Sequence, residues 1–181
     1  MIDSMRVRVL ASLVIGSLAA SGASFAEEPV HSFACDTPPG HFSDWTQSLS
    51  PGPVEITGTL TVNELRTDKK WSPVAGVMLD GGADGRTSFG VRLLANLKVK
   101  DMYFIEMHKP DGSEAMGLAG MIPRTQDPIP FSVALDAGGK LVVRIAGAEA
   151  TTDVGAFQPR GLSISCSTGD FVFKNVTIRR P

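Results

Sequence analysis

Apolar and polar residues alternate with a period of two along much of this chain, and that alternation restricts the fold more than any other feature. It is regular at 54–62 and again through 131–145, where it is interrupted by a glycine pair. Strands with one buried and one exposed face have this period, because successive side chains point to opposite faces. After residue 26, no segment has the capped 3.6-residue period of an amphipathic helix. The pattern predicts antiparallel strands joined by tight turns.

Turn residues divide the alternating pattern into separate strands. Gly138 and Gly139 supply the positive φ angles of a tight hairpin between 131–135 and 141–145. The best candidate for a helix is one short turn near 152–157. About ten to twelve short strands, punctuated by Gly and Pro and without a fixed repeat, predict an all-β antiparallel sandwich, a jelly roll or a barrel.

The C-terminal part of the chain predicts a second hairpin. Segments 162–166 and 171–178 both alternate, and the segment between them, 167–170, has the Ser-Thr-Gly-Asp composition of a turn. The apolar phase slips within the second segment, which predicts a β-bulge near Lys174 and Asn175.

The middle of the chain also has the composition of strands. Segment 73–79 is apolar without alternation, which predicts a central strand covered on both faces. Segments 87–94 and 102–108 are predicted to pair with each other through a turn at 98–100.

Residues 1–26 have the parts of a secretory signal peptide. Two arginines precede an apolar stretch at 9–20, and Ser24 and Ala26 are the small residues of a cleavage site. The competing reading is a membrane anchor, which needs about 18–20 apolar residues, more than this stretch contains. We therefore expect cleavage near Ala26, a single domain at 27–181, and a bacterial protein that is periplasmic or secreted.

Cys35 and Cys166 are the only cysteines in the sequence. In an exported protein, an even number of cysteines favours a disulfide, which would join the first strand after the signal peptide to the next-to-last one. Two buried free thiols are the alternative. Two thiols without neighbouring Cys or His residues would supply only half of a zinc site.

Several strand-like segments follow one another in the order 54–62, 71–77, 88–93, 130–135 with 141–143, and 162–166 with 169–176. In this order and pattern, the chain resembles the concanavalin A-like lectin and glucanase jelly rolls, the superfamily that also contains laminin G-type modules. The resemblance implies a concave sheet that often holds glycans. It also implies that the first and last strands lie side by side, which would suit a Cys35–Cys166 bond.

The motifs of the superfamily's catalytic members are missing from this sequence. Its glucanases carry a Glu-x-Asp-x-x-Glu run, which places the nucleophile and the acid on one face of a strand. No such run occurs here, and the nearest carboxylates, Glu64 and Asp68, have a different spacing. The strand motifs of the jelly-roll alginate lyases and a Gly-x-Ser-x-Gly nucleophile elbow are missing too. The sequence therefore predicts no catalytic residue.

A candidate ligand site comes from the predicted pairing of 87–94 with 102–108. Its register places Arg92 opposite Glu106 and brings Arg92, Phe104, Glu106 and His108 onto one open face. Phe104, or Trp71 at a loop-to-strand junction, is the candidate to stack against a sugar ring. The alternative is an Arg92–Glu106 ion pair on a solvated face, which contributes roughly 0.2–1 kcal/mol. In either case, Arg92 is expected to keep Glu106 ionised.

These observations predict an exported, non-catalytic module that binds a carbohydrate on its concave sheet face. One alternative is a structural or assembly protein of the cell envelope that acts through protein contacts, and another is a glycan hydrolase or lyase with an atypical site. No cofactor or metal-ligand set is predicted, although calcium bound by irregular loops stays open because 80–85 has an Asp/Gly composition without EF-hand spacing. A formal charge of −2 predicts no nucleic-acid partner, and no apolar run after residue 26 is long enough to span a membrane.

Overall fold

The fold was analysed in a computed structural model that describes residues 31–82, 87–96, 98–108 and 117–180. The predicted signal peptide and part of the Asp/Gly segment 80–85, considered above for calcium, lie outside these residues. Within the described ranges, the chain contains no helix with the length and apolar character needed to cross a membrane.

The described residues form strands and turns, which confirms the all-β class. The strands are β1 (His31–Ser48), β2 (Val54–Leu65), β3 (Val74–Gly81), β4 (Thr87–Leu94), β5 (Met102–His108), β6 (Gly117–Pro123), β7 (Ile129–Leu135), β8 (Lys140–Ile145), β9 (Ala148–Asp153) and β10 (Pro159–Arg179). Most are short, as predicted, but β1 has 18 residues and β10 has 21.

The two long strands form one bent ribbon that organises the fold. β1 and β10 pair antiparallel along nearly their whole length, so the first and last strands do lie side by side. β10 bends at Thr168, whose φ is +58°, and β1 bulges between Thr37 and Phe42 at the same level. The bend divides β10 into a first arm, 159–167, which pairs with β3, and a second arm, 169–179, which pairs with β2.

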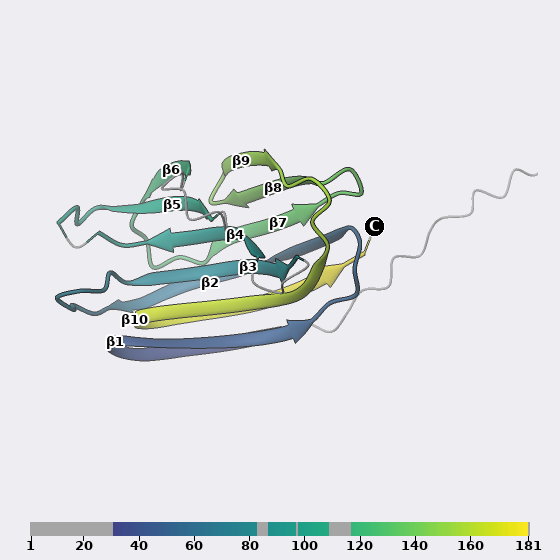
Figure 1. The fold of residues 1–181 in the computed structure, drawn as a ribbon. Helices are drawn as coiled ribbons and strands as arrows, with labels where there is room; N and C mark the ends of the chain where they lie inside the picture. The colour runs from purple at the N-terminus through teal and green to yellow at the C-terminus, as the bar shows by residue number, and fades with distance from the viewer. Residues whose placement is uncertain (1–30, 83–86, 97, 109–116, 181) are drawn as a thin grey trace, which may run out of the picture.

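The bent ribbon produces two stacked layers, which are visible in Figure 1. The front layer has the strand order β6-β5-β4-β3-β10, ending with the first arm of β10, and the back layer continues from the second arm through β2-β7-β8-β9. β1 lines the outside of both arms. The antiparallel sandwich predicted from the alternation is therefore confirmed.

The core lies between the layers and consists of the inward residues of the alternating strands. Along β10 these include Leu162, Ile164, Phe171, Phe173 and Ile178, all of which are at most 1% exposed. Burying each such side chain stabilises the fold by roughly 1.5–3 kcal/mol. β3 is buried on both faces through its middle, as its unbroken apolar run predicts.

A disulfide joins Cys35 to Cys166, so the alternative of two free thiols is wrong. Cys35 lies opposite Phe171 in the second arm of β10, whereas Cys166 belongs to the first arm. The two Cα atoms are 6.2 Å apart, and both side chains are buried. The bond therefore crosses from one layer to the other close to the bend.

The predicted hairpin between 162–166 and 171–178 is wrong, although the chain does turn at Thr168. The two arms of β10 cannot pair with each other, because β1 occupies one edge of each arm and β3 or β2 occupies the other. The predicted bulge is confirmed: the β10–β2 register shifts between Lys174 and Thr177, and Asn175 has a φ of +53°.

The hairpin of β7 and β8 is confirmed, with a different turn geometry. Of the two glycines, only Gly139 has a positive φ, +82°. The carboxylate of Asp136 accepts hydrogen bonds from the backbone N–H groups of Gly138 (2.8 Å) and Lys140 (2.9 Å), which fixes the turn. The segment 152–157 is the end of β9 and a turn, not a helix.

Candidate functional site

The predicted pairing of β4 with β5 is confirmed residue by residue. Arg92 lies opposite Glu106, Leu94 opposite Phe104, and Gly90 opposite His108. The intervening residues of β5 (Tyr103, Ile105 and Met107) are buried in the core. Phe104, Glu106 and His108 consequently belong to the outer face of the front layer, together with Arg92.

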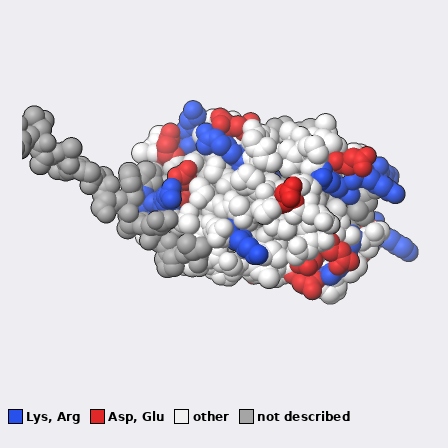
Figure 2. Space-filling model, turned by 180° about the vertical axis from the view of Figure 1, so that it is seen from behind, with Lys and Arg blue, Asp and Glu red and all other residues white. Residues whose placement is uncertain are grey.

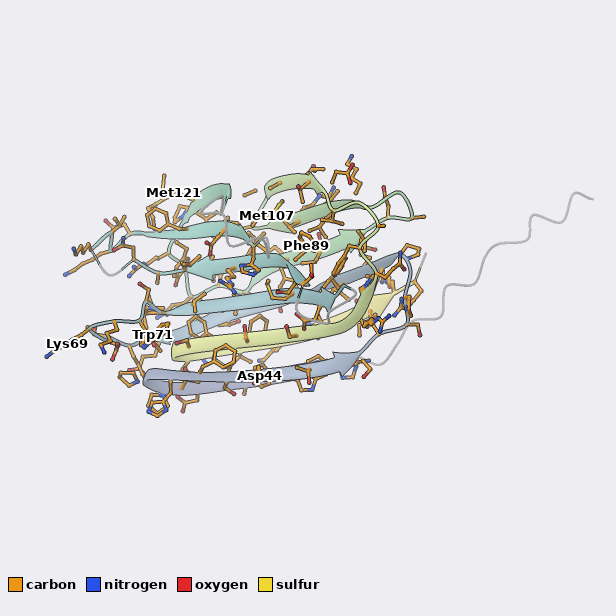
Figure 3. All side chains as sticks on the ribbon, viewed as in Figure 1. Asp44, Lys69, Trp71, Phe89, Met107 and Met121 are labelled. Carbon is orange, nitrogen blue, oxygen red and sulfur yellow. A yellow bond between two sulfur atoms is a disulfide. The ribbon has the colours of Figure 1, made fainter. Side chains whose placement is uncertain are left out.

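A pocket of about 330 Å³ opens on this face, near the bend of the β1–β10 ribbon. We call it the aromatic pocket, and its lining residues come from β1, the β2–β3 loop, β3, β4 and the first arm of β10: Gly40, His41, Phe42, Trp71, Ser72, Val74, Arg92, Ser165 and Ser167. Figure 3 places Trp71 at this end of the front layer, with Lys69 at the tip of the neighbouring loop.

Two exposed aromatic side chains stand at the pocket. Trp71 is 60% exposed and Phe42 is 65% exposed, unusually high values for such large apolar groups. Trp45, which the sequence also contains, instead packs against the core. Exposed aromatic rings are suited to stacking against a ligand that has one apolar and one polar side.

Local hydrogen bonds fix the segments that carry these two rings. The Asp68 carboxylate accepts hydrogen bonds from the backbone N–H groups of Lys70 (2.8 Å) and Trp71 (3.0 Å), which closes the loop before β3. In the bulge of β1, the N–H of Gly40 donates to Oγ1 of Thr168 at 3.3 Å. Gly40 has a φ of +73°, and a Cβ there would lie 3.7 Å from the Trp71 ring. The bulge and the loop therefore pack against each other.

The remaining lining residues supply polar groups. Ser165 and Ser167 alternate along the first arm of β10 with the inward-facing Ile164 and Cys166, so their hydroxyls point to the outer face. Arg92, from β4, is half-buried. The pocket thus combines aromatic rings, hydroxyl groups and one guanidinium.

Glu106 departs from its prediction, because it is only 5% exposed instead of lying on a solvated face. Burial raises the pKa of its carboxyl above the ordinary value, and the opposing effect of Arg92 is the smaller one. Arg92 does favour the ionised form, as expected, but burial has the larger effect on the pKa of Glu106. The pKa of His108 is lowered, first by burial and then by Arg92. Among the described residues, neither Oε2 of Glu106 nor Nδ1 of His108 has a hydrogen-bond partner.

The structure divides the predicted site residues into groups. It brings Trp71 and Arg92 together in the aromatic pocket. Phe104 lines a neighbouring hollow of about 170 Å³. Glu106 and His108 lie one strand beyond Arg92 and do not line the aromatic pocket.

The sequence reasoning missed the contributions of β1 and β10 to the pocket: His41, Phe42, Ser165 and Ser167. Ser165 could have been found from the alternation in 162–166, which places it on the outer face, whereas Ser167 fell within the predicted turn at 167–170. Phe42 follows Pro38, Pro39 and Gly40, residues that indicate an irregular segment without indicating where it lies.

The described residues contain no group of three or more His, Cys, Asp or Glu side chains arranged to hold a metal ion. The back layer has a different outer surface. Figure 2 shows that charged side chains are sparse across its middle and gather towards its rims. On this layer, the hydroxyls of Thr57 and Thr177 bond to each other at 2.7 Å, and the hydroxyl of Thr59 donates to the carbonyl of Lys174 at 3.3 Å.

The sequence matches no protein-family model and no curated protein. The structure is nevertheless similar to solved structures of low identity. One is a marine PL7 alginate lyase from Zobellia galactanivorans, with a TM-score of 0.54 and 12% identity over 82% of this chain and 76% of that one. Another is the CBM2 module of the evolved Dit protein of Lactobacillus casei BL23 phage J-1, with a TM-score of 0.53 and 10% identity over 84% and 79%.

A third similar structure is an alginate lyase from Pseudomonas aeruginosa, with a TM-score of 0.51 and 13% identity over 70% of this chain and 64% of that one. Likenesses at such identities establish the fold and leave activity to be argued from the site. At the level of fold, they agree with the predicted antiparallel β-sandwich of the jelly-roll type.

Proposed function

We propose that this protein is an exported, non-catalytic carbohydrate-binding module whose ligand occupies the aromatic pocket. The single observation that carries the proposal is the presence of two largely exposed aromatic rings, Trp71 and Phe42, in one pocket that also has polar lining residues. A pyranose has apolar C–H faces and a rim of hydroxyl groups. Its faces match the two rings, and its rim matches Ser165, Ser167 and Arg92.

The fold and the disulfide support the proposal independently. A CBM2 module and two alginate lyases share this architecture, and alginate is itself a carbohydrate. The Cys35–Cys166 bond fits an oxidising compartment, in agreement with the signal peptide expected at 1–26. On this proposal, the intact mass of the exported protein corresponds to a chain that begins after Ala26.

A glycan array followed by isothermal titration calorimetry tests the proposal. Trp71→Ala is expected to weaken binding of the selected glycan about tenfold or more, because tenfold corresponds to about 1.4 kcal/mol and buried aromatic anchors commonly exceed that value. Trp71→Phe should recover part of the affinity by restoring a ring.

The matched control is Met121→Ala, which removes another exposed apolar side chain (52% exposed) from β6, outside the aromatic pocket. It should leave the affinity unchanged. If no glycan binds the folded protein at millimolar concentration, the proposal is refuted, and the assembly-protein alternative becomes the better hypothesis.

A further inference from the structure

Arg92 extends across β3 towards the aromatic pocket because Gly76 leaves space for it. Gly76 pairs with Arg92 on one side and with Ser165 on the other. A Cβ at Gly76 would lie 3.2 Å from Cγ of Arg92 and 3.6 Å from Oγ of Ser165. The aliphatic part of the Arg92 side chain therefore lies beside the space that a side chain at position 76 would fill. From there, Arg92 reaches the aromatic pocket, which it lines.

Arg92 has no ionic partner in the part of the chain that the structure describes. The ion pairs found there involve Arg66 and Arg144. Glu106, opposite Arg92 in the register, forms no ion pair with it, and its buried Oε2 has no hydrogen-bond partner among the described residues. Asp44 belongs to the same cross-strand row as Arg92, three strand spacings away across the sheet, or about 14 Å between their backbones, and no ion pair joins the two side chains.

The surroundings of the aromatic pocket add positive charge. A second hollow shares Gly40 and Trp71 with it and is lined by Lys69 and Lys70. Asp68, the acidic residue of that hollow, accepts backbone hydrogen bonds from Lys70 and Trp71 through Oδ1, so the hollow holds two ammonium groups and one carboxylate. A guanidinium presents its donors in a planar fork that matches the oxygens of a carboxylate or a sulfate.

From this geometry we infer that the ligand of the aromatic pocket is an acidic sugar, whose carboxylate or sulfate group binds Arg92 while its ring stacks on Trp71. This inference rests on the proposed function and narrows its ligand class. A neutral sugar would accept hydrogen bonds from Arg92 but would leave the half-buried guanidinium without an anion in direct contact, with Glu106 acting on it only at longer range.

The test compares neutral, uronate-containing and sulfated oligosaccharides on one array, and then measures the Kd of the best ligand at 50 and 300 mM NaCl. We expect acidic glycans to be selected and their Kd to rise with salt, because an ion pair at a partly exposed site is screened. Arg92→Gln should weaken binding of the acidic glycan about tenfold or more and should reduce the salt dependence. The uronate and sulfate arms decide which oxyanion is bound.

Arg144→Gln is the matched control, since Arg144 is half-exposed on β8 in an ion pair with Glu149 and does not line the aromatic pocket. Selection of neutral glycans with a Kd that is insensitive to salt and to Arg92→Gln would overturn the inference while leaving the proposed function intact. Failure of all three classes to bind would instead refute the proposed function.

Discussion

Reducing the Cys35–Cys166 disulfide should destabilise the protein strongly, for a reason that the fold makes quantitative. The bond joins residues separated by 131 positions, so it closes most of the described chain into one loop. In the chain-entropy model, a loop of this length removes enough freedom from the unfolded chain to stabilise the native state by about 5 kcal/mol at 25 °C. Native disulfides span roughly 2–5 kcal/mol in practice.

The assay is urea unfolding of the oxidised and reduced protein, followed by the fluorescence of Trp45 and Trp71. With an m-value of about 2 kcal/mol/M, a loss of 2–5 kcal/mol lowers the midpoint by about 1–2.5 M urea. The same reductant should not affect a Cys35→Ala/Cys166→Ala variant, which controls for effects of the reductant itself. Ligand affinity is expected to fall as well, because Cys166 lies between the pocket residues Ser165 and Ser167.

A midpoint shift below about 0.5 M would refute this reasoning, since it corresponds to about 1 kcal/mol. Such a result would mean that the unfolded chain already holds the two ends close together without the bond. Unchanged ligand affinity in a reduced but folded protein would separately show that the bend keeps its shape through hydrogen bonds alone.

Two substitutions test the packing of the front layer. Because burial raises the folded-state pKa of Glu106, the free energy of unfolding of the wild type should fall as the pH rises through that pKa. Glu106→Gln should remove this loss, so that the variant is more stable than the wild type at pH 8 by on the order of 1 kcal/mol and no more stable at pH 4. A pH–stability curve of the variant that runs parallel to that of the wild type would contradict the burial argument. Gly90→Ala would place a Cβ 2.1 Å from the carbonyl oxygen of Val77 and should lower the stability measured by thermal unfolding by roughly 1–3 kcal/mol or more. The control is Gly120→Ala, whose Cβ would meet only the Ala148 side chain at 3.4 Å and which should stay within about 1 kcal/mol of wild type. Equal melting temperatures for the two variants would contradict the close contact at Gly90.

The strands and the local register were predictable because they depend on short-range chemistry. Alternation at 54–62 requires only that one face of a strand is buried, and β2 shows this pattern. The pairing of Arg92 with Glu106 followed from a short connection between two strands, which leaves few registers available. The slip in apolar phase at Asn175 likewise has a purely local cause, an extra residue in the strand.

The partners of β10 were not predictable in the same way. A turn composition at 167–170 and alternating arms are compatible both with a hairpin and with a strand that passes from one layer to the other. The choice depends on which edges other strands occupy, and β1, β2 and β3 fill all of them. Burial of Glu106 also depends on packing between elements distant in sequence, which the alternation of 102–108 cannot express.

The aromatic pocket forms where the regular pattern of the sheet is broken. In a regular strand, Phe42 would be one of many alternating residues. The bulge of β1 after Thr37 and the bend of β10 at Thr168 bring Gly40 and its neighbours close to the loop that carries Trp71. The N–H of Gly40 and the hydroxyl of Thr168 join the two irregular segments directly. A substitution that straightens either segment should therefore damage the pocket before it damages the sandwich. For the same reason, a prediction from regular strand patterns could place Arg92 in the candidate site but not Phe42.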